Sequence, residues 1–337
     1  GYANFALISR LRAAAPRGKP LEVRGVTMGK YKIFVDGSSG TTGLRIADRL
    51  AEREEFEILK ISEADRKDVR ARAAVINESD LSFLCLPDDA AREVVPLLRD
   101  DVRILDTSTA HRTAPGWVYG LPELHGTREA LKTATRVAVP GCHASGCIAL
   151  VKPLVDAGLL SPDAPLSLLS LTGYSGGGKR MIADYEAPDR PAALHAPRPY
   201  AVGQSHKHLP EIMHVCGLMR PPVFQPVVMD VFSGMLVSLP LTEGILARKA
   251  SLAEVSDTYR AFFKGAALVR VLEDNPEAVI DSVALSGSDR MELFVTGNDD
   301  RMIAYARFDN LGKGACGAAI ECLNLVLGAP PLTGLAL

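Results

Sequence analysis

One segment near the start of the chain restricts the fold more than any other. The apolar run Lys32–Asp36 predicts a strand, Gly37–Gly43 has the spacing G-x-x-G-x-x-G, and a helical pattern with Leu44, Ile46 and Leu50 on one face follows. Such glycines let a backbone approach a pyrophosphate, whose charge a helix N-terminus stabilises. We therefore expect an α/β Rossmann-type dinucleotide-binding domain; a plain tight turn is the alternative. The expected cofactor-binding residues here are Gly37, Ser39, Gly40, Thr41, Thr42 and Gly43.

The end of the second expected strand, Phe56–Ile61, bears on the choice of dinucleotide. An NAD site holds the ribose hydroxyls with an acidic residue about 20 residues after the glycines. Here Arg66 and Lys67 follow the strand, and their charge suits the 2′-phosphate of NADP. We therefore expect NADP (NADPH), with Ser62 and Arg66 as binding residues. Acidic residues at the same strand end leave NAD open, and a solvated helix start is the other alternative.

Two further apolar strands extend this half of the chain. Leu81–Leu86 is nearly unbroken, as expected in a buried parallel sheet, and Val102–Asp106 follows it. Hydroxyl-bearing residues and then Arg112 come directly after the second of these strands. Arginine forms paired hydrogen bonds with phosphate or carboxylate, so Arg112 is a candidate substrate-binding residue. A capped turn with a surface arginine is the alternative.

A cysteine follows the next short strand. Val137–Val139 leads into Pro140 and Gly141, Cys142 comes next, and a helical pattern covers Ile148–Ala157. A sulfur near a helix N-terminus is stabilised as the thiolate, and its pKa is expected to fall. The thiolate is the attacking species in acyl transfer, so Cys142 is the candidate nucleophile. A small buried residue that only packs is the alternative.

A glycine-rich segment follows the strand Leu166–Thr172. Gly173–Lys179 carries a hydroxyl pair and a lysine, and we recognise no helical pattern directly after it, so it is not a P-loop. It is expected to fold against a substrate through Tyr174, Ser175 and Lys179.

Two histidines and a glutamate lie within six residues further along. His206, His208 and Glu211 suit acid–base work, because histidine titrates near neutral pH. A metal site with His214 and Cys216 matches no standard zinc spacing, so no metal is expected. Ordinary polar histidines at a helix start remain the other alternative.

The remainder of the chain is rich in strand patterns. A capping box at Ser251–Glu254 opens a helix that is expected to end at Phe263, and Asn310–Ala318 leads from the last strand into the closing helix, Ala319–Leu327. We expect an α+β domain with a mixed or antiparallel sheet, which carries the catalytic residues and the contacts between subunits. The expected strands are Val227–Leu241 with one polar break, Val269–Leu272, Val283–Leu285, Met291–Thr296 and Met302–Asp309. The expected parts are residues 1–27, an extension; 28–141, the dinucleotide-binding domain; 142–309, the second domain; and 310–337, a helix that returns to the first domain.

The composition excludes several classes of protein. The net charge of −2 and the lack of a basic block argue against a nucleic-acid partner, and no apolar run approaches the ~18–20 residues of a membrane span. Six scattered cysteines without a CxxC pair fit the reducing cytoplasm. The segment Gly1–Thr27 is basic, and we expect it to be a flexible or loosely docked extension ahead of a natural start at Met28; a transit peptide is the alternative.

Taken together, these motifs resemble one family, the N-acetyl-gamma-glutamyl-phosphate reductases of arginine biosynthesis, in their shorter form, within the aspartate-semialdehyde dehydrogenase-like superfamily. The long form usually has Asn before Pro-Gly-Cys and Tyr-Pro-Thr after it, whereas here Val139 precedes and His143, Ala144 and Ser145 follow. The motifs that carry the resemblance are Gly37–Gly43, Pro140–Cys142, Gly173–Lys179, His206–Glu211 and Asn310–Ala315.

The resemblance implies an NADPH-dependent enzyme that reduces an acyl phosphate to an aldehyde through a cysteine thioester, as a homodimer or homotetramer. It implies that Cys142 attacks the acyl carbon, that His208, oriented by Glu211, is the proton donor with His206 in reserve, and that Arg112 holds the phosphate. Asn310 and Gly314 would lie beside the nicotinamide.

Two alternatives remain open. Aspartate-semialdehyde or aminoadipate-semialdehyde enzymes use the same chemistry on another substrate. A non-catalytic NADP sensor with a Rossmann fold would have no need for Cys142, His208 and Arg112 together.

Overall fold

The computed structural model describes residues 30–38, 40–273 and 278–337, and Tyr31–Leu337 form one compact unit. The predicted extension Gly1–Thr27 lies outside the described residues. No helix within the described ranges is long and apolar enough to cross a lipid bilayer.

The elements of the first half lie in the order β1 (Tyr31–Asp36), α1 (Thr41–Ala51), β2 (Phe56–Ile58), α2 (Val69–Glu78), β3 (Leu81–Leu84), α3 (Asp88–Val94), η1 (Val95–Leu97), β4 (Arg103–Asp106), β5 (Val118–Tyr119), α4 (Thr127–Leu131), β6 (Arg136–Ala138) and α5 (Cys142–Asp156). The second half continues with β7 (Ser167–Gly173), η2 (Tyr174–Gly177), α6 (Gly178–Glu186), η3 (Ala192–His195), β8 (Arg198–Pro199), α7 (Leu209–Cys216), β9 (Val223–Met229), β10 (Met235–Thr242), α8 (Leu252–Phe262), β11 (Val269–Val271), β12 (Met291–Asn298), β13 (Arg301–Phe308), η4 (Gly312–Cys316) and α9 (Gly317–Leu327).

The first sheet has six strands in the order β2-β1-β3-β4-β6-β5, and every neighbouring pair is parallel. Its helices cover both faces. Ile46 of α1 and Ile320 of α9 share one apolar cluster with Phe83, whereas Ile76 of α2 packs with Phe34 on the opposite face. This is the expected Rossmann-type arrangement, and the prediction of the fold is confirmed. The carboxyl ends of its strands meet at one edge, where parallel sheets place their ligands.

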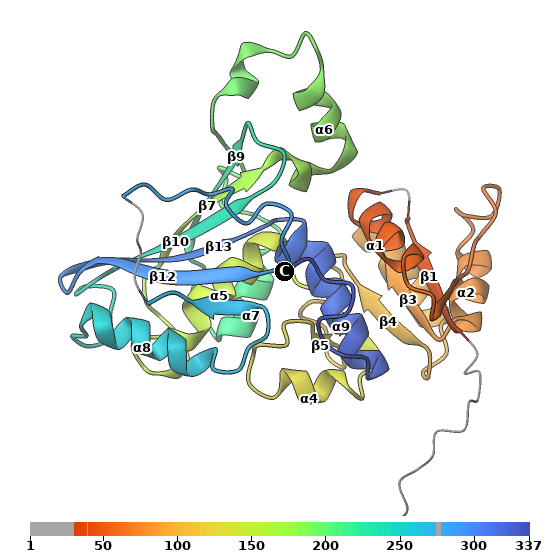
Figure 1. Cartoon of the computed structure of the whole chain (residues 1–337), viewed down its shortest axis with the longest axis horizontal. Coiled ribbons are helices and arrows are strands. Elements are labelled where there is room, and N and C mark those ends of the chain that lie inside the picture. The colour runs from red at the N-terminus through yellow and green to blue at the C-terminus, as the bar shows by residue number, and fades with distance from the viewer. Residues whose placement is uncertain (1–29, 39, 274–277) are drawn as a thin grey trace, which may run out of the picture. The chain divides into compact units, whose positions relative to one another are not determined.

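The second sheet has seven strands in the mixed order β11-β12-β13-β10-β7-β9-β8. Helices α5, α7 and α8 cover one of its faces, and Figure 1 shows this layer beside the first sheet with α9 between them. The mixed α+β class is therefore confirmed as well. The expected strand Val283–Leu285 is wrong, because this segment is a turn. The domain boundaries expected at residues 28, 142 and 310 stay a prediction.

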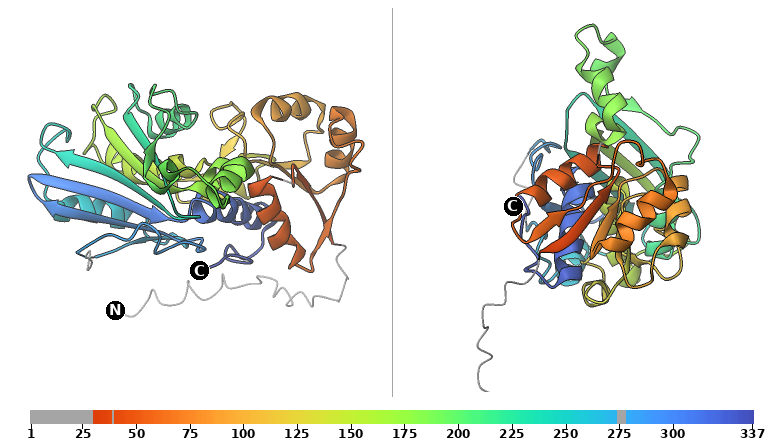
Figure 2. Two further views of the ribbon diagram at one scale, coloured as in Figure 1. Left: turned by 90° about the horizontal axis from the view of Figure 1, so that it is seen from above. Right: turned by 90° about the vertical axis from the view of Figure 1, so that its right-hand side faces the viewer.

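The segment between β7 and β8 projects from the second sheet, as Figure 1 and the right-hand view of Figure 2 show. It is held by its own small apolar cluster, in which Tyr174 stacks on Tyr185 beside Leu194. A helix, α6, begins at Gly178, contrary to our sequence expectation. Met181, Ile182 and Tyr185 share one face of this helix and pack in the same apolar cluster, a helical spacing that our sequence analysis did not recognise.

Candidate active site

A cavity of about 480 Å³ lies where the two sheets meet. The carboxyl ends of β3, β4 and β6 supply Cys85, Thr107 and Pro140 to its wall. The start of α1 and residues from the second half close the other sides. Of the expected site residues, it brings together Gly40, Thr41, Thr42, Gly43, Arg112, Cys142, Ser175, His206, His208, Asn310 and Gly314.

Cys142 is the first residue of α5 and is half-buried at the cavity wall. Gly141 caps the helix in an extended conformation, so the strand turns into the helix at the cysteine. Burial raises the pKa of the Cys142 thiol, while the backbone N–H of His143 and the charges of Arg112 and Lys207 act to lower it. The net direction is opposite to our sequence expectation, because desolvation of the thiolate outweighs the helix terminus.

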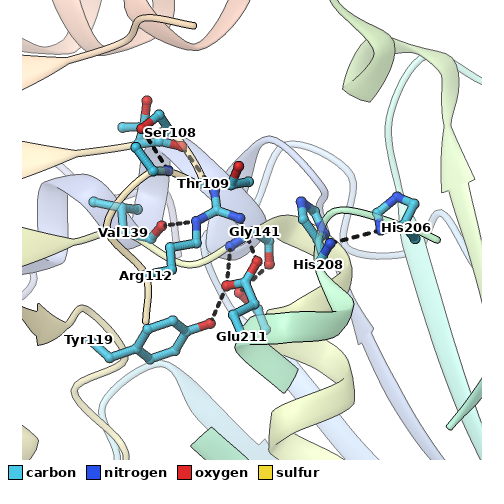
Figure 3. A network of polar contacts seen from close by, with 12 residues as sticks. Ser108, Thr109, Arg112, Tyr119, Val139, Gly141, His206, His208 and Glu211 are labelled. Atoms are coloured by element: carbon cyan, nitrogen blue, oxygen red, sulfur yellow. Dashed lines mark hydrogen bonds and ion pairs between the residues drawn. The ribbon is translucent and has the colours of Figure 1, made fainter. Parts of the chain in front are cut away.

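Arg112 is anchored by three acceptors rather than left open to solvent (Figure 3). Its guanidinium donates to the carbonyls of Val139 and Thr107 at 3.0 and 2.9 Å and forms a buried ion pair with Glu211. The side chain is only 8% exposed and faces the cavity. The positive charge is therefore held in one place beside Cys142.

Glu211 accepts three hydrogen bonds from described residues, and none of the donors is His208. Arg112 and the hydroxyl of Tyr119, at 2.6 Å, donate to its carboxylate, and so does the Gly141 N–H at 3.2 Å. The expected orientation of His208 by Glu211 is therefore wrong for this structure. Glu211 instead fixes the turn that precedes Cys142. It also lines a second pocket, of about 270 Å³, which Arg112 and Lys207 share with the main cavity.

His208 is buried and lies over Gly141, since a Cβ added to that glycine would collide with His208 Nε2. Its Nδ1 has no hydrogen-bond partner among the described residues. Burial and the nearby charge of Arg112 hold the pKa of His208 well below its usual value. His208 is thus a neutral imidazole that can accept a proton beside Cys142.

His206 lies next to it. Its Nδ1 accepts the backbone N–H of His208 at 3.1 Å, and burial with the charge of Lys207 lowers the pKa of His206 to about 4. The two rings are in edge-to-face contact, so the pair forms one polar wall of the cavity.

Asn310 and Gly314 also line the cavity. Asn310 donates to Ser175 Oγ at 3.0 Å and accepts the Gly234 N–H at 3.0 Å, which fixes its amide. Gly314 lies in η4, a π-helical turn, and π-turns are frequent at functional sites.

The start of α1 forms a cradle suited to a dinucleotide phosphate. A Cβ on Gly43 would collide with the Gly37 carbonyl, so the turn can close only around glycine. The hydroxyl of Thr41 is buried at the cavity wall and has no partner among the described residues. A free donor at a helix N-terminus fits the oxygens of a pyrophosphate.

Several expected residues lie away from the cavity. Tyr174 is packed against Tyr185 and bonds to Glu186, and Lys179 is exposed on α6. Ser62 bonds to Asp65, and Arg66 pairs with Glu63 at the surface. Gly37 supports the cradle without lining the cavity, and Ser39 lies outside the described residues.

Sequence reasoning missed several cavity residues, among them His143 and Tyr200. His143 Nε2 and the Tyr200 hydroxyl are 2.6 Å apart, and both residues line the cavity. Adjacency to the cysteine was the available signal for His143. Tyr200 lies in an irregular segment with no motif around it.

Two family models match this chain. Residues 32–134 match the NAD binding domain of semialdehyde dehydrogenases, and residues 142–310 match the semialdehyde dehydrogenase dimerisation domain.

Curated relatives match nearly the whole chain. It is 41% identical over 327 residues to N-acetyl-gamma-glutamyl-phosphate reductase 2 of Nostoc sp., covering 91% of this chain and 100% of the relative. It is 46% identical over 308 residues to N-acetyl-gamma-glutamyl-phosphate reductase of Brucella anthropi, covering 89% and 99%.

Solved structures share the fold at low identity. Aspartate semialdehyde dehydrogenase II from Vibrio cholerae, complexed with ASA, matches with a TM-score of 0.64 at 14% identity, over 89% of this chain and 98% of that one. Aspartate semialdehyde dehydrogenase with NADP from Candida albicans matches with a TM-score of 0.61 at 16% identity, over 88% and 98%.

Proposed function

The chain belongs to the semialdehyde dehydrogenase family, among its N-acetyl-gamma-glutamyl-phosphate reductases, and we propose that it reduces N-acetyl-L-glutamyl 5-phosphate to N-acetyl-L-glutamate 5-semialdehyde and phosphate in arginine biosynthesis. One observation supports this most strongly. Cys142, His208 and Arg112 line the same cavity as the glycine cradle of α1. A nucleophile, a base and an anion-binding group thus share one space with a dinucleotide site.

The first step of the proposed reaction is nucleophilic attack by Cys142. His208, a buried neutral imidazole, takes the thiol proton at Nε2. The sulfur then attacks the acyl carbon, the C–O bond to phosphate breaks, and phosphate leaves with its electron pair, which gives a thioester on Cys142. The raised pKa of the Cys142 thiol makes this base necessary.

Arg112 supports the step electrostatically. Its charge is held by Glu211 and two carbonyls, so it can face the departing phosphate without reorganising. Lys207 lines both the main cavity and the second pocket, and adds positive charge at the same wall.

NADPH is the proposed cofactor, and when bound it supplies the hydride that reduces the thioester. Gly40, Thr41, Thr42 and Gly43 would hold its pyrophosphate, and Asn310 with Gly314 would line the nicotinamide side. Protonated His208 then stabilises the oxyanion of the hemithioacetal on Cys142. Collapse breaks the C–S bond and returns its electron pair to the sulfur.

We also propose an oligomeric state and a cellular compartment for this chain. The matched dimerisation domain supports self-association, and we expect a homodimer or homotetramer. Six free cysteines suit a reducing environment, so we expect the cytoplasm.

The test is phosphate-dependent reduction of NADP with N-acetylglutamate 5-semialdehyde, run beside aspartate semialdehyde and beside NAD. We expect turnover with the acetylated substrate and NADP, lost in Cys142→Ala. Cys147→Ala is the matched control, because Cys147 lies one helical turn and a half further along α5, is buried and does not line the cavity.

Other outcomes are equally informative. Turnover only with another aldehyde would move the chain to a sister enzyme with the same cysteine chemistry. NADPH binding without turnover of any aldehyde would indicate a sensor, and full activity of Cys142→Ala would reject the thioester mechanism.

A further inference from the structure

The residue after the nucleophile holds a chain of three hydrogen-bonding side chains. His143 Nδ1 lies 2.6 Å from Ser170 Oγ, and His143 Nε2 lies 2.6 Å from the Tyr200 hydroxyl. His143 and Ser170 are 2% and 0% exposed, so water cannot replace the contact between them, whereas the contact with Tyr200 is part-buried at the cavity wall. Among the described residues, His143 is the hydrogen-bond partner of both hydroxyls.

We assign the order of donors along this chain by asking which order leaves no buried hydrogen without an acceptor. Burial lowers the pKa of His143 to about 3, so the ring is neutral and carries a single N–H. Ser170 is fully buried in β7, and His143 Nδ1 is the one hydrogen-bond partner of its hydroxyl among the described residues. If Nδ1 carried the ring hydrogen, the buried Ser170 hydrogen would have no acceptor, which is costly. Nδ1 therefore accepts, and the ring hydrogen is on Nε2. Nε2–H then donates to the Tyr200 oxygen, which leaves the phenol hydrogen for another acceptor.

That hydrogen is available inside the cavity. Tyr200 lines the cavity with Cys142, and the charge of the Cys142 thiolate adds to burial in raising the pKa of the phenol. A neutral phenol close to the sulfur can donate to an oxygen on the carbon that the sulfur attacks.

The backbone after Tyr200 has an unusual conformation that holds the tyrosine at the cavity wall. Ala201 and Gln204 have φ angles of 51° and 57°, a conformation that costs free energy in residues other than glycine. The Gln204 amide compensates by pairing with both the N–H and the carbonyl of Phe224 at 2.9 Å. The same short loop carries Tyr200 at one end and His206 at the other, so both reach the cavity.

We propose that Tyr200 is a further catalytic residue, whose hydroxyl donates a hydrogen bond to the carbonyl oxygen of the acyl group on Cys142, and that Ser170 and His143 are positioning residues that turn this hydrogen toward the cavity. The role of Tyr200 rests on the proposed function. The order of donors along the chain does not, because it follows from the three side chains alone.

The first experiment measures Tyr200→Phe. Removing one donor to a developing oxyanion typically costs on the order of 10²-fold in kcat. We expect kcat and kcat/KM to fall together, because the contact strengthens when charge develops on the oxygen. Tyr185→Phe is the matched control: its hydroxyl is buried in the projecting segment with no partner among the described residues, and it does not line the cavity. A Tyr200→Phe enzyme with wild-type kcat would overturn the proposal.

A double-mutant cycle separates positioning from simple packing. If Ser170 acts through Tyr200, Ser170→Ala lowers kcat in the wild type but not in the Tyr200→Phe background. A fall of the same factor in both backgrounds would show that Ser170 only supports the fold. Thermal unfolding of each variant shows that it is folded.

Nitrogen NMR of the wild-type protein with labelled histidine tests the same order of donors without any substrate. We expect His143 to carry its hydrogen on Nε2, and a hydrogen on Nδ1 would overturn the positioning role even if the enzyme is fully active. If the acetylated substrate is not turned over at all, the proposed function fails, and this measurement still decides the order of donors.

Discussion

Gly314 packs directly on Cys142. A Cβ built on Gly314 would lie 2.9 Å from Cys142 Cβ and 3.1 Å from the Asp309 carbonyl, closer than side chains normally approach. The glycine of the π-helical turn therefore helps to set the position of the nucleophile.

The first prediction concerns this contact. Gly314→Ala is expected to displace Cys142 by a few tenths of an ångström and to lower kcat by on the order of 10-fold or more, since small misplacements of reacting groups are costly. Steady-state kinetics and thermal unfolding measure the two effects. Gly244→Ala is the control, because nothing lies within 4 Å of its added Cβ. Equal kcat values for the two variants would contradict the argument.

The second prediction concerns Glu211. Glu211→Gln leaves the buried guanidinium of Arg112 without its charged partner, and breaking a buried ion pair typically costs about 3–5 kcal/mol in the free energy of unfolding. Urea denaturation measures this cost. Glu254→Gln, which breaks the exposed pair with Arg248, is the control and should cost far less, because solvent screens an exposed ion pair. If both variants lose the same amount, Arg112 is not held by Glu211 as described.

The third prediction concerns a fully buried lysine. Lys313 donates to Glu123 and Glu321 at 2.6 Å each, just before α9. Burial, together with the charge of Glu123, raises the pKa of Glu321 to about 7, although Lys313 opposes this. Because the folded protein binds this proton more tightly than the unfolded chain, the contribution to stability is complete below the ordinary pKa of Glu321, 4.5, and is lost as the pH rises toward about 7.

Glu321→Gln removes this titration. As the pH rises through the same window, the wild type should therefore lose free energy of unfolding relative to this variant. The difference between the two proteins should change by at most about 1.4 kcal/mol per pH unit. Urea denaturation of both proteins at several pH values measures the difference. Parallel curves across the window would refute the assignment.

The fourth prediction concerns His206, whose contribution to stability is lost as the pH falls rather than as it rises. Its pKa is lowered to about 4 from 6.5, so the unfolded chain binds the additional proton between these values. Its contribution to stability is complete above 6.5 and is lost as the pH falls toward about 4. As the pH falls through this window, the wild type should lose more of its free energy of unfolding than His206→Gln does. The difference should be less than about 1.4 kcal/mol per pH unit, because the ring is partly solvated. Acid sensitivity that is unchanged in the variant would show that His206 is not the group that titrates.

The local patterns were sufficient for much of the fold. The strand, glycine turn and helix at residues 32–50 predicted the Rossmann-type sheet, and the Ser251–Glu254 capping box is present, with Ser251 Oγ accepting the Glu254 N–H. The apolar segment Val283–Leu285 failed as a strand, because its residues cover the loop beside Gly234 rather than pairing with a neighbour. The resemblance to the reductase family is confirmed by the curated relatives.

The sequence by itself determined the chemistry that this chain carries: a cysteine at a strand–helix turn, a glycine cradle, and histidines beside a glutamate. Only the tertiary structure decided which groups face each other. Glu211 pairs with Arg112, 99 positions away, and not with His208 three positions before it. Tyr200 reaches His143 from a segment without any motif. Local residue preferences extend over a turn of helix or a pair of strands, whereas hydrogen-bond partners and desolvation depend on packing between distant segments. For that reason the raised pKa of Cys142 and the Ser170–His143–Tyr200 chain emerged only from the folded protein.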